Sequence, residues 1–220
     1  MLARVDERGF VRAHTRLGRA PLVPELALHL ADGILPLWEL VERHFGETGT
    51  DPPFWAFAWA GGQALARYVL DHPGEVAGRS VLDIATGGGI VALAAVRAGA
   101  GSVLAADTGR FAGAAVALNA AANGVAVDFT GDDLLARDPP PVDVVLVGDA
   151  CYERGMSDRL LRWLRAAPGR VLLGDPGRAY LPADGLDLLA AYDVQAAADL
   201  EGIAVRRTAV YAVRSGRTPP

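Results

Sequence analysis

The chain has 220 residues, a formal net charge of −5, and a composition that is 51% hydrophobic and 21% charged, which is ordinary for a globular protein rather than a disordered or fibrous one. The acidic balance argues against a broad nucleic-acid surface, and no apolar run reaches the ~18 residues that a membrane span needs. The first thirty residues lack a continuous apolar segment and the chain has a single cysteine, so we expect no signal or transit peptide and predict a cytoplasmic protein.

The N-terminal third shows no strand pattern, and we expect residues 1–72 to form a helical extension packed on the main domain, residues 73–220. The segment 24–45 has helical periodicity despite an internal glycine and proline. The segment 61–73 predicts a second helix, which its proline ends.

From residue 80 onward, short apolar runs alternate with helical stretches, which is the pattern of a parallel sheet covered on both faces. The expected strands are residues 80–84, 102–106, 125–129, 142–147 and 170–174. The expected crossover helices, rich in alanine and leucine, are residues 90–99, 111–123 and 156–167.

The last part of the chain predicts a short helix and then two more strands. Residues 183–192 are expected to be helical, and residues 193–197 and 204–213 to form an antiparallel pair that closes the sheet. The fold class is therefore α/β, with a doubly wound, mostly parallel sheet of seven strands.

Three consecutive glycines follow the first strand of the expected sheet, in the stretch "VLDIATGGGIVALAA" (81–95). Glycines at such a turn let backbone N–H groups and a helix N-terminus approach an anionic group closely. Gly87, Gly89 and Ala92 also satisfy G-x-G-x-x-A, which by itself fits a dinucleotide fold as well as a methyl-donor fold.

Four acidic residues near this turn favour a cationic nucleotide. Asp83 precedes the turn and can face an amino group, and Asp107 ends the second strand, placed to accept hydrogen bonds from ribose hydroxyls. Asp132 and Asp133 follow the third strand, where they can meet an adenine amino group. Each acid alone could be a strand-end turn or an N-cap, but together they predict S-adenosylmethionine, whose sulfonium favours acidic surroundings.

Some residue types are missing, and their absence excludes several kinds of chemistry. All 21 basic residues are arginine, so Schiff-base, P-loop and Tyr/Lys dehydrogenase chemistry lack their lysine. The four histidines do not sit at metal-ligand spacing, and we expect no metal site.

The strand-turn stretch "VLDIATGGG" resembles the "VLDLGxGxG" pattern of the class I, seven-stranded methyltransferases. This resemblance implies a Rossmann-like fold with S-adenosylmethionine as cofactor and S-adenosylhomocysteine as product. Ala85 stands where the pattern has its first glycine, and we expect a slightly adjusted backbone there rather than lost binding.

Three further stretches narrow the resemblance. "PPFWAFAWAGGQALARYVLDHP", "GDACY" and "VLLGDPGR" are similar to the lysine methyltransferases that act on the beta subunit of electron transfer flavoprotein, over roughly residues 10–213. The likeness implies a protein substrate, with the flavoprotein beta subunit as the expected partner. Methylation of a small amine or a nicotinamide-like ring nitrogen, or of a ribosomal protein, stays open as an alternative.

The end of the fourth strand carries the expected acceptor chemistry. Ligands of open α/β sheets bind at the carboxyl ends of the strands, where Asp149 stands, and the resembled family has Asp-x-x-Tyr there, which Asp149 and Tyr152 match. Asp149 is expected to orient the lysine nitrogen, whether or not it also takes the proton, and Tyr152 to wall the channel. Cys151 is expected to be a small packing residue.

Other residues receive roles by position or by resemblance. In the resembled family a tryptophan of the Trp-x-Gly-Gly stretch borders the cofactor, and that role falls on Trp59. Gly148, directly before Asp149, is counted with the cofactor-binding residues Trp59, Asp83, Ala85, Gly87, Gly89, Asp107, Asp132 and Asp133. Arg178 could hold a substrate carboxylate or brace its turn, and the structural role is favoured.

Two other function classes stay open on the sequence alone. A scaffold that has lost catalysis is disfavoured by the presence of all the acids named above. An NAD-dependent reductase is disfavoured by Asp83, which would repel a pyrophosphate.

Overall fold

The computed structural model describes residues 6–45, 51–195 and 205–216. In chain order the elements are α1 (Glu7–His14), β1 (Arg16–Ala20), β2 (Val23–Leu30), α2 (Ile34–Phe45), η1 (Phe54–Ala56), α3 (Ala60–Asp71), η2 (Pro73–Glu75), β3 (Ser80–Ile84), α4 (Ile90–Arg97), β4 (Ser102–Ala106), α5 (Ala112–Ala122), β5 (Asp128–Thr130), η3 (Leu134–Ala136), β6 (Val144–Gly148), α6 (Arg154–Ala166), β7 (Arg170–Asp175), β8 (Leu186–Gln195) and β9 (Val205–Val213). Within this described part, no helix is both long and apolar enough to cross a membrane.

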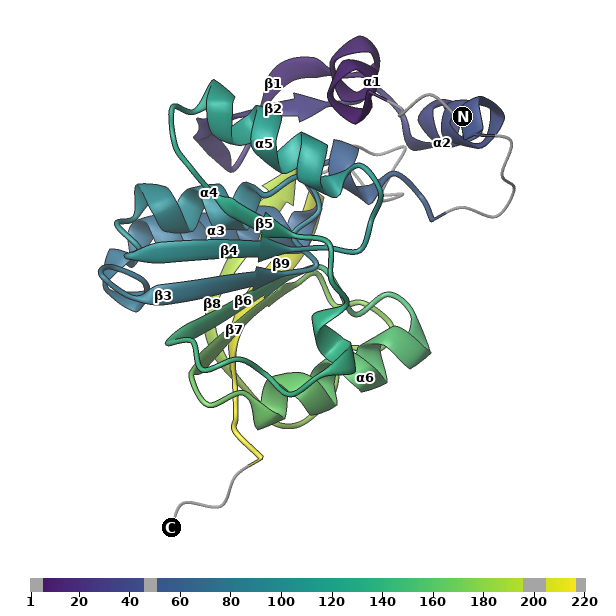
Figure 1. Ribbon diagram of the computed structural model, residues 1–220. Coiled ribbons are helices and arrows are strands. Elements are labelled where there is room, and N and C mark those ends of the chain that lie inside the picture. Colours follow the sequence, from purple (N-terminus) through teal and green to yellow (C-terminus); the bar gives the residue numbers. More distant parts are fainter. Residues whose placement is uncertain (1–5, 46–50, 196–204, 217–220) are drawn as a thin grey trace.

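Seven of the strands form one sheet in the order β5-β4-β3-β6-β7-β9-β8 (Figure 1). The strands from β5 to β7 are parallel, and β9 runs antiparallel to both β7 and β8. The predicted doubly wound sheet of seven strands is therefore confirmed. The strand order reverses between β3 and β6, which is where ligands bind in such sheets.

The two faces of the sheet carry separate apolar cores, which explains why the central strands read as continuous apolar runs. Along β6, Val144 and Leu146 point to the core under α3 and α4, whereas Val145 and Val147 point to the core under α6. Helix α6 is amphipathic, since its leucines and tryptophan are buried while Arg162 is exposed.

The prediction that residues 1–72 contain no strand is wrong. Residues 16–30 form the antiparallel hairpin β1–β2, which lies over α5 (Figure 1), so the helix expected over 24–45 is confined to α2. The cause is tertiary: side chains of α5 take the place of a neighbouring strand along β2. Asn119 accepts the N–H of His29, and Asn123 both accepts the N–H and donates to the carbonyl of Ala27.

The helix predicted over residues 183–192 is also wrong. Residues from Leu186 onward belong to β8, which pairs with β9 through a register shift between Leu188 and Ala190. Alanine and leucine favour a helix locally, but pairing along the whole of β9 satisfies the backbone better at the sheet edge. The predicted antiparallel pair is confirmed, and the connection expected between its strands lies outside the described residues.

Candidate functional site

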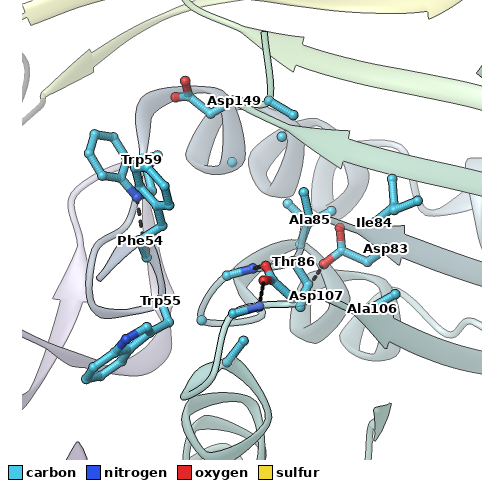
Figure 2. Close-up of a pocket in the computed structure, with 18 of the residues that line it drawn as sticks. Phe54, Trp55, Trp59, Asp83, Ile84, Ala85, Thr86, Ala106, Asp107 and Asp149 are labelled. Carbon is cyan, nitrogen blue, oxygen red and sulfur yellow. Dashed lines mark hydrogen bonds between the residues drawn. The ribbon is translucent and has the colours of Figure 1, made fainter. Parts of the chain in front are cut away.

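The main cavity of the described chain has a volume of about 350 Å³ and lies at the carboxyl ends of β3, β4 and β6. Figure 2 shows Asp107 and Asp149 on opposite sides of it, with Trp59 and Phe54 on a third. We call the part around the glycine turn and Asp107 the cofactor end, and the part around Asp149 and Tyr152 the acceptor end. Every site residue predicted from the sequence lines this one cavity except Gly89, which caps α4 beside it.

The glycine turn of the cofactor end leads from β3 into α4. Gly87 and Gly89 have φ of +54° and +84°, and Ala85 also lies in the left-handed region, at +54°. This conformation costs an L residue about 1 kcal/mol, so Ala85 is accommodated with some backbone strain. A Cβ on Gly88 would lie 2.6 Å from the carbonyl oxygen of Trp55, so this position has no room for a side chain.

Two side chains from other elements hold this turn in place. Asp107, at the end of β4, accepts the N–H of Gly87 at 2.8 Å with Oδ2 and that of Gly109 at 2.8 Å with Oδ1. Asn119 of α5 donates to the carbonyl of Gly88. Each carboxylate oxygen of Asp107 has a further lone pair, so both can still accept a ligand hydroxyl.

Asp83 holds the turn from within and also lines the cavity. Its Oδ2 accepts the Thr86 hydroxyl at 2.5 Å and the N–H of Ala92 at 3.0 Å. Burial raises the pKa of Asp83 to about 7, because desolvation disfavours the charged form. Thr86 was not foreseen from the sequence, although a hydroxyl three residues after a strand-end acid is a common turn partner.

Asp132 and Asp133 line the cavity but are tied to arginines. Asp132 pairs with Arg137 and Asp133 with Arg159, both at 2.7 Å. Asp133 also caps η3 by accepting the N–H of Leu135. Asp133 therefore has the N-cap role that the sequence left open for each acid alone. A ligand would compete with the arginines for the carboxylates of both Asp132 and Asp133.

The acceptor end is built around Asp149, which is 8% exposed and has φ of +60°. Its Oδ2 accepts the N–H of Gly61 at 2.7 Å, and its Oδ1 accepts Nε–H of Arg178 at 2.5 Å. Gly61 lies in the first turn of α3, whose N-cap residue Trp59 provides no side-chain acceptor. Asp149 thus caps α3 from another element, and the positive end of the helix stabilises its charge.

Glycines allow this junction to form. A Cβ on Gly61 would lie 2.4 Å from the carbonyl oxygen of Gly174, and one on Gly148 would lie 2.7 Å from Cα of Gly62. The first turn of α3 therefore packs directly against the ends of β6 and β7. This packing brings three stretches of the sequence into contact: Trp-x-Gly-Gly, Gly-Asp-x-Cys-Tyr and Gly-Asp-Pro-Gly-Arg.

Arg178, for which the sequence favoured bracing of its turn over holding a substrate carboxylate, lies at this junction. Its backbone N–H donates to Asp175 at 2.7 Å, its guanidinium binds Asp149, and it lies 5.8 Å from the centre of the Trp59 ring. Burial raises the pKa of Asp175 to about 6. The sequence did not reveal that Arg178 and Asp149 are partners, because nothing in a local pattern pairs residues on different loops.

Aromatic side chains wall the acceptor end. Tyr152 is 46% exposed and its ring centre lies 5.1 Å from that of Phe54, while Trp59 donates Nε1–H to the carbonyl of Phe54 at 3.0 Å. Trp55 and Phe57 are buried in the core. Partial burial and nearby carboxylates raise the pKa of Tyr152, which keeps its phenol protonated.

Cys151 faces away from this chemistry. It is fully buried in the core under α6, and burial raises the pKa of its thiol to about 12. A thiol in this setting is a poor nucleophile, in agreement with the packing role predicted for it. Over the described ranges, no three histidine, cysteine or acidic residues are grouped as a metal ion would require.

Comparison with solved structures shows the same fold. A putative RNA methyltransferase from Pyrococcus horikoshii superposes with a TM-score of 0.55 and 12% identity, over 70% of this chain and 83% of its own. Magnesium protoporphyrin IX methyltransferase from Synechocystis PCC 6803, solved with bound S-adenosylmethionine, matches with a TM-score of 0.54 and 20% identity, over 98% of this chain and 100% of its own. The family model of ribosomal protein L11 methyltransferase matches residues 63–147.

Curated relatives are more similar in sequence. The electron transfer flavoprotein beta subunit lysine methyltransferase of Xenopus laevis is 38% identical over 78% of this chain and 71% of its own length. The proteins of that name from Rattus norvegicus and Homo sapiens are 40% and 37% identical, and the chain spans 62% and 66% of their lengths. The chain is thus an S-adenosylmethionine-dependent methyltransferase and belongs to the electron transfer flavoprotein beta subunit lysine methyltransferase family.

Proposed function

We propose that this enzyme transfers a methyl group from S-adenosylmethionine to a lysine of the beta subunit of electron transfer flavoprotein. The observation that carries the proposal is that the glycine turn with Asp107 and the buried carboxylate of Asp149 face each other across the same cavity. The names of the curated relatives support the same substrate.

The residues of the cofactor end fit S-adenosylmethionine. Gly87, Gly88 and Gly89 present a backbone without side chains, Asp107 keeps free lone pairs for ribose hydroxyls, and a volume of about 350 Å³ suits a nucleoside with an amino-acid tail. Asp83 would face the amino group, Asp132 and Asp133 the adenine, and Trp59 the border with the acceptor. When bound, the cofactor supplies an electrophilic methyl carbon on a sulfonium.

Asp149 acts on the acceptor nitrogen. A lysine amine has a reference pKa of about 10.4 and must lose a proton before it can attack carbon. Both oxygens of Asp149 already accept a hydrogen bond, from Gly61 and from Arg178, and each retains a lone pair for the amine. We infer that Asp149 orients the nitrogen and that water carries the proton away.

Tyr152 and Phe54 would line the passage of the lysine side chain, with Tyr152 close enough to the mouth to meet a protein surface. Transfer then depends on in-line placement in a dry pocket rather than on covalent help from the protein. Asp51, an exposed acid at the rim, suits a basic segment of a folded partner. The cytoplasmic location predicted from the sequence stays a prediction.

The alternative of ribosomal-protein methylation draws on the family-model match, but that match ends at residue 147. It therefore covers most of the cofactor end and stops before Asp149 and Tyr152, which are the residues that meet the acceptor. A small amine is the other alternative, and the exposure of Tyr152 favours a protein instead.

The direct test incubates the enzyme with methyl-labelled S-adenosylmethionine and purified flavoprotein beta subunit from the same source. We expect label on one or a few lysines, located by peptide mass spectrometry. Ribosomal proteins and nicotinamide, offered in parallel reactions, serve as competing acceptors. Label on either of these with none on the beta subunit would overturn the proposed substrate.

A further inference from the structure

The ion pair between Arg178 and Asp149 raises a question that the proposed function leaves open. Methyl transfer needs a neutral amine, yet an isolated carboxylate stabilises the protonated ammonium form. Asp149 is not isolated, because Arg178 lies against it at 2.5 Å with a side chain that is 18% exposed. The pair carries no net charge, so it can accept a hydrogen bond without attracting a proton strongly.

We propose that Arg178 is a positioning residue with two separable effects, and this proposal rests on the proposed amine acceptor. Arg178 fixes the Asp149 carboxylate in place. The positive charge of Arg178 also makes the bound lysine nitrogen release its proton. The first effect uses the hydrogen bond from Nε–H of Arg178 to the Asp149 carboxylate. This bond matters because the backbone of Asp149 is held in the left-handed region, at φ of +60°. The second effect uses the positive charge alone.

Arg178 is itself held so that its guanidinium stays in this place. Its backbone N–H and that of Gly177 both donate to Oδ1 of Asp175 at 2.7 Å, which fixes the loop after β7. The Trp59 ring lies on another side of the guanidinium, at 5.8 Å, a distance at which an aromatic face attracts a cation. The charge is therefore anchored by β7 and by the segment before α3.

Other charged or titratable groups surround the acceptor end, and none of them replaces Arg178. The first turn of α3 contributes only backbone N–H groups, and Cys151 stays a neutral thiol. Among the described residues, the other groups near this end are acids, a protonated phenol and one paired arginine: Asp175 from β7, Glu153 at the start of α6, Asp107 after β4, Asp51, Tyr152, and Arg159, whose charge is paired with Asp133 at 2.7 Å. With Arg178 neutralised, the balance turns negative and the ammonium form of the substrate is favoured.

The test uses three variants and one control. R178K keeps the positive charge but loses the planar geometry of the guanidinium group. R178M and R178Q both remove the charge, and R178Q can still donate an N–H. R162M removes an arginine from the exposed face of α6 and controls for the loss of one positive charge. Thermal unfolding of each variant checks that it is folded.

The first measurement needs no protein substrate. Sinefungin is the S-adenosylmethionine analogue in which a C–NH3⁺ group replaces the methylated sulfonium. The ratio of its affinity to that of S-adenosylhomocysteine therefore reports how strongly the site favours binding of an ammonium group. We expect R178M and R178Q to raise this ratio roughly three- to thirtyfold, the range for removing a like charge about 8 Å away at an effective dielectric constant between about 20 and 80. R178K and R162M should leave it unchanged.

The second measurement is the pH dependence of single-turnover methylation of the flavoprotein beta subunit. In R178M and R178Q we expect the pH of half-maximal rate to move upward by roughly 0.5 to 1 unit, whereas R178K should lose rate without that movement. A merely structural Arg178 would lower the rate of all three variants equally at every pH and leave the sinefungin ratio unchanged, and that result would overturn the inference. If the ratio rises but the beta subunit is not methylated by the wild type, the inference stands and the proposed substrate fails.

Discussion

The two ends of the cavity are built in different ways. The cofactor end is formed largely by one continuous segment, residues 83–89, steadied by Asp107, whereas the acceptor end brings together the start of α3, the end of β6 and the loop after β7. A loop built from one segment can be recognised by its own sequence pattern. A junction of three segments depends on close packing between glycines, so a change in any one of them disturbs the others.

Replacement of Asp149 should give the largest loss of activity. D149N keeps one acceptor for Gly61 but loses the charge and the second carboxylate oxygen, and we expect methylation to fall by roughly 10²- to 10³-fold. Binding of S-adenosylhomocysteine, measured by calorimetry, should stay within about threefold of the wild type, because binding depends on the other end of the cavity. Unchanged turnover of D149N would remove the proposed role of this residue.

The converse result is expected for Asp107. D107A removes the acceptor for Gly87 and for the ribose, and hydrogen bonds to a charged group contribute about 1.5–3 kcal/mol each, so the affinity for S-adenosylhomocysteine should fall roughly 10- to 100-fold. At saturating cofactor the rate should recover most of the wild-type value. D107N, which keeps one acceptor oxygen, is the matched control, and equal affinity of all three proteins would contradict the assignment.

The close packing of the acceptor end can be tested through Gly61. In G61A the new Cβ would lie 2.4 Å from the carbonyl oxygen of Gly174, and overpacking of this kind costs about 1–3 kcal/mol. We expect a lower thermal unfolding midpoint together with reduced methylation. G74A places its Cβ where no atom lies within 4 Å, so it should change neither quantity, and equal behaviour of the two variants would show that the junction is not tightly packed.

Asp83 predicts a pH dependence of stability at the cofactor end. Its folded-state pKa of about 7 lies above the ordinary value of 3.8, so the folded protein binds this proton more tightly than the unfolded chain does. The resulting stabilisation is complete below about pH 4 and is lost as the pH rises through 7. D83N should therefore lose less stability than the wild type between pH 5 and pH 8 in urea titrations, and parallel pH profiles would contradict this prediction.

The smallest effect is expected at Ala85, which has φ of +54°. A85G should stabilise the protein by up to about 1 kcal/mol, because glycine adopts this conformation freely while losing some entropy on folding. A92G, inside α4, should instead destabilise by about 1 kcal/mol. A loss of stability in A85G similar to that in A92G would show that Ala85 is not strained.

The sequence predicted most of the sheet and the cofactor end because their signals are local. Apolar runs such as β6, and a glycine turn between a strand and a helix, carry their structure in neighbouring residues. Asp149 and Tyr152 were predicted as acceptor-side residues by combining the strand-end rule with the family resemblance.

What the sequence did not predict depends on contacts between distant residues. The hairpin β1–β2 depends on Asn119 of α5 and on Asn123, the C-cap residue of that helix, which bind the backbone of β2. The helix expected in place of β8 fails because β9 provides a pairing strand. The capping of α3 by Asp149 and the pairing of Asp149 with Arg178 likewise join segments that no local pattern connects.

The most direct test of the two-ended cavity is a crystal structure of the enzyme with S-adenosylhomocysteine. We expect ribose hydroxyls within hydrogen-bond distance of the Asp107 carboxylate, and a sulfur atom that faces Asp149 across the cavity. A nucleoside bound away from Gly87 and Asp107, or a sulfur that faces away from Asp149, would contradict this expectation.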